Sequence, residues 1–182
     1  MVDGKDTKDQ TVAEMSRKVG LIFQNPNHQL FKGEVAAEID FGTINMGWDD
    51  DRIQSSRQRV MDLVGLSGYD KWDPESLSIG QKQRVAIASV LVMEPRILLL
   101  DEPTTGQDTR TLEPFMKLVS TLNQQGMTVL MITHDMDVAL RYASRILVMG
   151  NGKTIADGSP NEIFLNEACL EEAQLHLPGV LE

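Results

Sequence analysis

The sequence predicts an α/β domain built on a mainly parallel sheet. Short apolar runs alternate with longer segments of helical pattern, and the three clearest runs are residues 19–23, 96–100 and 127–132. The second run ends at Asp101-Glu102, and the third ends at Thr133-His134. Both are expected to be buried parallel strands. Because open α/β sheets bind ligands at the carboxyl ends of their strands, we expect these polar residues at the functional edge.

The segment between the first two runs, from about Val35 to Val92, is expected to be mostly helical. Within it, residues 52–66 repeat apolar side chains at the spacing of one helix face. The later part of the chain gives two local signals. Gly150-Asn151-Gly152 predicts a hairpin between strands at 146–149 and 153–156, because both turn positions need a positive φ.

Ser159-Pro160-Asn161-Glu162 combines an N-cap, a proline at the first helical position and a glutamate for a capping box. This combination predicts a short helix through about Asn166, followed by a helical tail.

The composition is that of a globular chain with an acidic balance. The 182 residues include 17 Lys and Arg against 27 Asp and Glu, which gives a formal charge of −10. This charge disfavours a broad surface for nucleic acid or anionic lipid, so we expect no nucleic-acid partner. Cys169 is the one cysteine, which excludes an internal disulfide or a multi-thiolate metal site. The chain start lacks the apolar region of a signal peptide, so an intracellular protein is expected.

The apolar run that ends at Asp101-Glu102 carries the strongest chemical signal. A buried strand that delivers two adjacent carboxylates to its carboxyl end suits nucleotide hydrolysis. The first carboxylate can hold Mg²⁺, and the second can polarise a water molecule aimed at a γ-phosphate. For this stretch alone, an ordinary strand followed by an acidic turn is an equally open interpretation.

The segment Leu77-Ser78-Ile79-Gly80-Gln81 predicts a helix start with Ser78 as its N-cap. Free backbone N–H groups at a helix start form a ready anion site. The alternative is a well-capped amphipathic helix that binds nothing.

Two single residues follow strand ends. Gln24 follows the first apolar run, where its side-chain oxygen can reach Mg²⁺ and move with its loop, although a lone glutamine there is commonly a solvated loop residue. His134 follows the third run, where it can hydrogen-bond a terminal phosphate and sense its loss. A helix-capping or surface histidine is the alternative.

Together, and in this order, these residues resemble the ATP-binding cassette (ABC) ATPases that drive membrane transporters. The matching motifs are the Q-loop at Gln24, the signature motif at Leu77–Gln81, the Walker B segment at Leu98–Pro103, the D-loop at Thr104–Asp108 and the switch histidine at His134. The resemblance runs from about Val2 to Phe164. Residues 24–31 and 34–42 further resemble the cobalt/nickel and energy-coupling-factor vitamin-uptake branch.

The resemblance implies a P-loop NTPase-like α/β fold with an inserted helical subdomain. It places the ATPase core at 1–32 and 95–158, the helical signature subdomain at 33–94 and a C-terminal helical tail at 159–182. It implies ATP and Mg²⁺ as cofactors. By this resemblance Asp101 anchors Mg²⁺, Glu102 activates the water, His134 contacts the γ-phosphate and Gln24 touches both metal and water.

The resemblance also implies two partners. A second ATPase subunit is expected to pack head to tail as a homo- or heterodimer, with Ser78, Gly80 and Gln81 closing over ATP held by the other copy and Asp108 coupling the two sites. The segment from Gln24 through the helical subdomain is expected to dock on a transmembrane transporter subunit. The protein is therefore expected at the cytoplasmic face of the membrane, as a peripheral component.

Two departures from the family pattern stand out. Ile79 replaces the first glycine of the usual LSGGQ, which crowds the phosphate approach or marks one unequal site of a heterodimer. No G-x-x-x-x-G-K-[S/T] precedes Gln24, so the fold is expected to lack the amino-terminal P-loop strand and helix. Gly152-Lys153-Thr154 is interpreted as part of the hairpin, since Leu147 stands where a P-loop needs its first glycine.

This interpretation places the missing strand beside residues 97–100 and expects that strand to have unpaired backbone and uncovered apolar side chains. The chain alone is therefore expected to be weakly stable or prone to aggregation, and not to hydrolyse ATP at a useful rate. The function expected of the complete form is ATP binding and hydrolysis that powers transport. A non-catalytic regulatory or assembly subunit is the alternative. A DNA-repair or chromosome-organising ATPase ranks lower, since the acidic chain lacks basic surfaces and long coiled coils.

Overall fold

The computed structural model describes residues 1–104 and 109–175. The chain divides into two compact units, Met1–Ile132 and Thr133–Glu182. Each unit has its own secondary structure and its own buried core, and each is described by itself.

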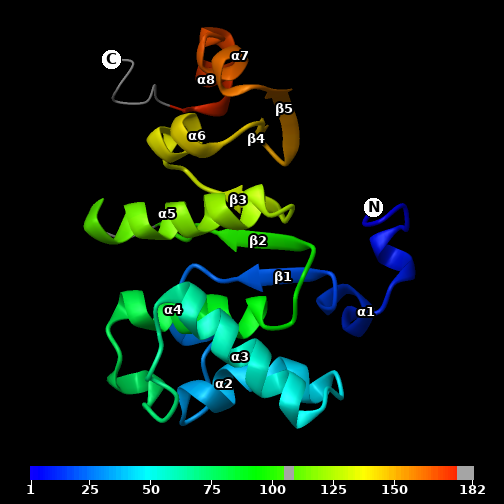
Figure 1. The fold of residues 1–182 in the computed structure, drawn as a ribbon. Coiled ribbons are helices and arrows are strands. Elements are labelled where there is room, and N and C mark those ends of the chain that lie inside the picture. Colours follow the sequence, from blue (N-terminus) through cyan, green and yellow to red (C-terminus); the bar gives the residue numbers. More distant parts are fainter. Residues whose placement is uncertain (105–108, 176–182) are drawn as a thin grey trace. The chain divides into compact units, whose positions relative to one another are not determined.

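The first unit contains a parallel sheet and a group of helices (Figure 1). Its elements in chain order are η1 (Thr7–Asp9), α1 (Val12–Ser16), β1 (Val19–Ile22), η2 (Pro26–His28), α2 (Val35–Asn45), α3 (Asp50–Val64), η3 (Pro74–Ser76), α4 (Ile79–Leu91), β2 (Ile97–Asp101), α5 (Thr109–Gln124) and β3 (Thr128–Ile132). The three predicted strands and the helical segment between the first two are confirmed. Helix α1 was not predicted, although its capping box between Thr11 and Glu14 is visible in the sequence.

The sheet has the order β1-β2-β3, and both pairs are parallel (Figure 1). In register, Val19 stands opposite Ile97, and Ile97 stands opposite Thr128. Each strand is added beside the one before it. Right-handed crossovers in this order place the connecting helices on the same face of the sheet.

The central position of β2 corrects one expectation from the sequence. Residues 97–100 were expected to lack a neighbouring strand, and this is wrong, because β2 pairs with β1 on one side and with β3 on the other. Leu98 and Leu100 are each only 1% exposed, so the strand is covered as well as paired. The outer edges of the three-stranded sheet belong to β1 and β3.

Strand β3 gives a second correction. It was expected to be buried, yet Leu130 is 49% exposed and Ile132 is 60% exposed. Leu21 of β1, which shares the row of Leu99 and Leu130 in the register, is 42% exposed. The helices therefore cover one face of the sheet, and the opposite face presents apolar side chains to solvent.

The helical part of the first unit packs α2, α3 and α4 together around buried apolar side chains that include Val35, Ile39, Val60, Met61 and Val85. Helix α3 begins at the N-cap Asp49 and ends at Gly65, which has the left-handed conformation typical of a C-cap.

Asp40 is a buried carboxylate on α2 that forms an ion pair with Arg57 of α3. Burial raises the pKa of Asp40, and the Arg57 guanidinium opposes that shift.

The second unit contains α6 (Met136–Tyr142), β4 (Ile146–Gly150), β5 (Lys153–Gly158), α7 (Pro160–Phe164) and α8 (Glu167–Ala173). The predicted hairpin is confirmed, because β4 and β5 pair antiparallel and Asn151 and Gly152 have φ values of 50° and 73°. The helix predicted after Ser159 is also confirmed, with a complete capping box between Ser159 and Glu162. Val148, Ile163 and Cys169 form the small core of this unit.

Within the part of the chain that the structure describes, no helix combines the length and the apolar character needed to span a membrane.

Candidate functional site

The strand register brings Gln24 and Glu102 to the same point on the carboxyl edge of the sheet. Ile22 of β1 stands opposite Leu100 of β2, and each of the two site residues follows two positions later. Gln24 Nε2 donates a hydrogen bond to Glu102 Oε2 across 3.2 Å. Both residues were predicted to belong to the site because each follows a strand, and they are in direct contact.

Asp101 and Glu102 differ in backbone conformation although they are adjacent. Asp101 is the last residue of β2 and pairs with Ile132 of β3. Glu102 has a φ of 42°, and its N–H donates to the Ile132 carbonyl oxygen across 2.9 Å. A left-handed conformation costs a non-glycine residue about 1–3 kcal/mol and is concentrated at functional sites. The residue after the strand, Glu102, is therefore strained. It carries the second of the two adjacent carboxylates, and Asp101 carries the first.

The start of α4 contains the signature residues, and its predicted N-cap is confirmed. The Ser78 hydroxyl accepts from the Gln81 N–H across 3.3 Å, while Gln81 Oε1 accepts from the Ser78 N–H across 3.0 Å. Gln81 Nε2 also donates to the Tyr69 hydroxyl across 3.1 Å. Ile79, at the first helical position, is 59% exposed and is followed by Gly80.

A hydrogen bond connects helix α4 to the carboxyl edge of the sheet, and it is made by a residue that was not predicted to belong to the site. Gln83 is only 7% exposed, and its Nε2 donates to the Pro103 carbonyl oxygen across 2.6 Å. Pro103 directly follows Glu102. The helix that begins with the signature residues is thus bonded to the loop that holds the second carboxylate.

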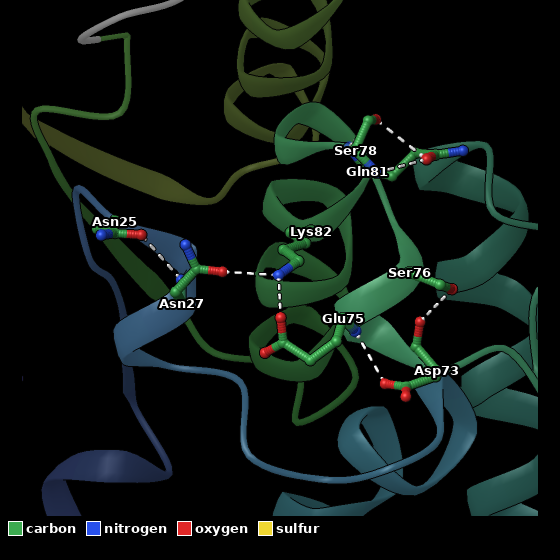
Figure 2. Close-up of polar contacts among 8 residues, drawn as sticks. All are labelled: Asn25, Asn27, Asp73, Glu75, Ser76, Ser78, Gln81 and Lys82. Atoms are coloured by element: carbon green, nitrogen blue, oxygen red, sulfur yellow. Dashed lines mark hydrogen bonds and ion pairs between the residues drawn. The ribbon is translucent and has the colours of Figure 1, made fainter.

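A second tie connects α4 to the segment that follows Gln24. Lys82 Nζ donates to Asn27 Oδ1 across 2.9 Å (Figure 2). One turn further along the helix, Gln29 Nε2 donates to the Ala86 carbonyl oxygen across 3.0 Å. These contacts could not be predicted from the sequence, because polar residues on a buried helix face do not stand out in a hydrophobic pattern.

Two of the predicted site residues do not belong to the described part of the first unit. His134 belongs to the second unit and precedes Asp135, the N-cap of α6, whose Oδ1 accepts from the Val138 N–H across 3.0 Å. The predicted role of His134 at the γ-phosphate therefore stays a prediction. Asp108, together with residues 105–107, lies outside the described residues, so its predicted coupling role also stays a prediction.

The residues at the carboxyl edge fit Mg²⁺ only as part of its coordination shell. No cluster of three or more His, Cys, Asp or Glu side chains suited to a metal occurs among residues 1–104 and 109–175. Mg²⁺ is usually held by one or two carboxylates together with phosphate oxygens and water, rather than by an all-protein cage. The Asp101 carboxylate and the Gln24 amide oxygen match that mode of binding.

Comparison with known proteins identifies the family of the chain. The protein-family model described as ABC transporter matches residues 1–105. The chain belongs to the ABC transporter family. The ABC assignment made from the motifs is therefore confirmed, as is the mixed α/β fold with a parallel sheet.

Individual relatives narrow the assignment within the ABC transporter family. The energy-coupling factor transporter ATP-binding protein EcfA of Methanothermobacter thermautotrophicus is 38% identical over 180 residues, which are 98% of this chain and 58% of that protein. The solved structure of cbiO1 from Clostridium perfringens, described as part of the ABC transporter complex cbiONQ, is 36% identical with a TM-score of 0.76. The match covers 90% of this chain and 66% of cbiO1. The cobalt and energy-coupling branch expected from the sequence fits these relatives.

The chain spans only part of the proteins that it matches. A Vibrio vulnificus relative is 40% identical over 182 residues, which are 100% of this chain and 32% of that protein. A Methanothermobacter marburgensis relative is also 40% identical, over 99% of this chain and 66% of its own length.

Proposed function

We propose that this chain forms part of the ATP-binding and ATP-hydrolysing component of an ABC transporter that takes up cobalt, nickel or a vitamin. The relatives EcfA and cbiO1 support the transporter class. The contact between Gln24 and Glu102 at the carboxyl edge carries the catalytic part of the proposal.

Glu102 acts as the group that accepts a proton from the hydrolytic water. The Gln24 amide nitrogen donates to one carboxylate oxygen of Glu102, which orients the carboxylate while the side-chain oxygen of Gln24 remains an acceptor for water or metal. Asp101 supplies a carboxylate ligand to Mg²⁺. When bound, ATP supplies the triphosphate whose terminal phosphoryl group is transferred to water. His134 contacts that terminal phosphate.

The signature residues act on a second ATPase subunit. Ser78, Gly80 and Gln81 at the start of α4 contact the phosphates of ATP held by that subunit, because a helix start favours anions. Asp108 couples the two sites. The proposed division of the chain is an ATPase core at 1–32 and 95–158, a helical subdomain at 33–94 and a helical tail at 159–182.

The transmembrane partner docks near the segment that follows Gln24. Phe31 is 62% exposed, and its ring meets Phe41 edge to face with the centroids 4.9 Å apart. Lys32 Nζ lies 4.6 Å from the centroid of Phe41, and Ile44 is also exposed. An exposed apolar group of this kind favours a protein partner. The protein is thereby held at the cytoplasmic face of the membrane as a peripheral component.

Hydrolysis is tested in the assembled transporter that contains this chain. The change Glu102→Gln removes the proton acceptor but keeps the side-chain size, so the ATPase rate is expected to fall about 100- to 10,000-fold while ATP binding persists. Glu113→Gln on the exposed side of α5 is the matched control and is expected to leave the rate unchanged. Equal rates for the wild type and Glu102→Gln would overturn the catalytic assignment.

The isolated chain is expected not to hydrolyse ATP at a useful rate, because its residues include no P-loop sequence. Titration calorimetry with ATP and Mg²⁺ measures the nucleotide binding on which hydrolysis depends. Tight, Mg²⁺-dependent binding to the isolated chain would contradict the expectation. The alternative is a non-catalytic regulatory subunit. It would be favoured if substitutions at Glu102 and Gln24 left the ATPase rate of the assembled transporter unchanged.

A further inference from the structure

Lys82 occupies an unfavourable position for a lysine. It is the fourth residue of α4 and is only 8% exposed, whereas lysine is rarely buried unless it is paired. The first turn of a helix also carries the positive end of the helix dipole, which disfavours a cation. Core packing does not account for a charged side chain here, so we look to the contacts of its ammonium group.

The Lys82 ammonium joins two separate turns to the helix (Figure 2). Its Nζ donates to Asn27 Oδ1 across 2.9 Å and to Glu75 Oε2 across 2.5 Å. Asn27 lies in η2 and Glu75 lies in η3. One charged group therefore connects the segment after Gln24, the turn that precedes the signature residues and the start of α4.

Both acceptors are held in place before they meet Lys82. Each of the two turns has a buried proline at its first position, Pro26 in η2 and Pro74 in η3. In each turn the backbone N–H of the residue that contacts Lys82 donates to the side chain of the N-cap residue. Asn27 N–H donates to Asn25 Oδ1 across 3.0 Å, and Glu75 N–H donates to Asp73 Oδ1 across 2.9 Å (Figure 2). Little conformational entropy is lost when these acceptors bind the ammonium group, because their backbones are already fixed.

The groups that Lys82 connects lie close in the chain to the predicted site residues. Gln24, which contacts Glu102, lies three residues before Asn27. Ser78 and Gln81, which form the capping box, lie within four residues before Lys82. A displacement of the segment after Gln24 is therefore applied to the same turn of α4 that presents the signature residues.

We propose that Lys82 is a positioning residue, which holds the segment after Gln24 and the start of α4 as one element and transmits movement between them. Lys82 acts through these neighbours and not on the reacting atoms. The consequence for hydrolysis rests on the proposed function, whereas the coupling itself is a property of this chain.

The coupling is tested by amide hydrogen exchange on the chain with Lys82→Met, Asn27→Ala and the double variant. The reporters are the Lys82 N–H, bonded to the Ser78 carbonyl across 2.8 Å, and the His28 N–H, bonded to the Asn25 carbonyl across 3.0 Å. Each single variant is expected to accelerate exchange in both segments, by about tenfold for loss of one hydrogen bond to a charged group. The double variant is expected to add little beyond either single one.

Asn27 is exposed, so Asn27→Ala keeps the test available even where Lys82→Met does not fold. Lys82→Arg retains the charge but changes the geometry of the donors, so it is expected to restore only part of the protection. Lys117→Met, at an exposed position of α5, is the matched control and is expected to change neither segment. The proposal is overturned when Asn27→Ala accelerates exchange only at residues 26–30, or when the effects of the two substitutions simply add.

The effect on hydrolysis is measured separately in the assembled transporter. Lys82→Met is expected to lower kcat about tenfold with the KM for ATP unchanged, because a residue that contacts neither nucleotide nor metal alters alignment rather than binding. A raised KM with an unchanged kcat would overturn the positioning role. A wild-type transporter without ATPase activity would refute the proposed function but leave the exchange experiment as a test of the coupling.

Discussion

Gly20 in β1 packs against α4 at a point with no room for a methyl group. A Cβ at this position would lie 2.1 Å from Val90 Cγ1 and 3.3 Å from Pro95 Cγ. Non-bonded carbon atoms approach to about 3.5 Å, so either β1 or α4 must shift by roughly 1.4 Å to accept Gly20→Ala. Val90 is only 6% exposed and cannot swing into solvent. We therefore expect Gly20→Ala to lower the free energy of unfolding by about 1–3 kcal/mol, the usual cost of overpacking.

Urea unfolding followed by tryptophan fluorescence measures this loss in the correct unit, because Trp48 and Trp72 both lie in Met1–Ile132. Gly33→Ala is the matched control, since a Cβ there meets nothing within 4 Å, and its effect is expected to stay within about 0.5 kcal/mol. Val90→Ala removes the clashing methyl group, so the double variant is expected to be less destabilised than the sum of the single variants. Equal stabilities of the two glycine variants, or strict additivity with Val90→Ala, would refute the steric argument.

Three further predictions follow from burial, turn geometry and charge. Leu98→Ala is expected to cost about 2–5 kcal/mol because the side chain is 1% exposed, whereas Leu130→Ala, at 49% exposure, is expected to cost less than about 1 kcal/mol, both by urea unfolding. Gly152→Ala is expected to destabilise the hairpin by about 1 kcal/mol because its φ is 73°, as measured by amide exchange in β4 and β5. Hydrogen bonding to Arg145 lowers the pKa of Asp157, so its stabilising contribution is present above the unfolded pKa of about 3.9 and is lost as the pH falls through the lower folded value. Asp157→Asn is expected to flatten the acid side of the stability curve, measured by circular dichroism.

Each of these predictions has an outcome that contradicts it. Equal losses for Leu98→Ala and Leu130→Ala would mean that the exposed sheet face is covered in solution. Unchanged exchange in Gly152→Ala would mean that the turn adopts another conformation. An acid transition that is the same with and without Asp157 would assign the pH dependence to other carboxylates.

The sequence predicted the parts of this molecule that depend on local signals. The Asn151-Gly152 turn and the Ser78 N-cap each require particular residues within a four-residue window, and both occur as expected. The contact between Gln24 and Glu102 was reachable only because both residues follow strands that are parallel neighbours. The order of the strands could not be predicted from the sequence. The position of β2 between β1 and β3 depends on the side of the sheet edge to which each crossover connection adds the next strand.

The missed contacts share one physical cause. Lys82 and Gln83 are buried polar residues, and a hydrophobic pattern assigns polar residues to the solvent side of a helix. Their acceptors, Asn27 and the Pro103 carbonyl, lie 55 and 20 positions away in the chain. Nothing in a sequence window around α4 encodes partners at that separation.

Cys169 is the only thiol of the chain and is 5% exposed in the core of the second unit, beside Val148 and Ile163. An alkylating reagent reaches this sulfur only when that core opens, so the rate of its modification in native buffer reports the local opening equilibrium. No tryptophan belongs to this unit. In the wild-type chain, the rate of Cys169 alkylation therefore reports opening of the second unit, and tryptophan fluorescence reports unfolding of the first unit. Comparing the two signals tests whether the units unfold together, without any introduced label.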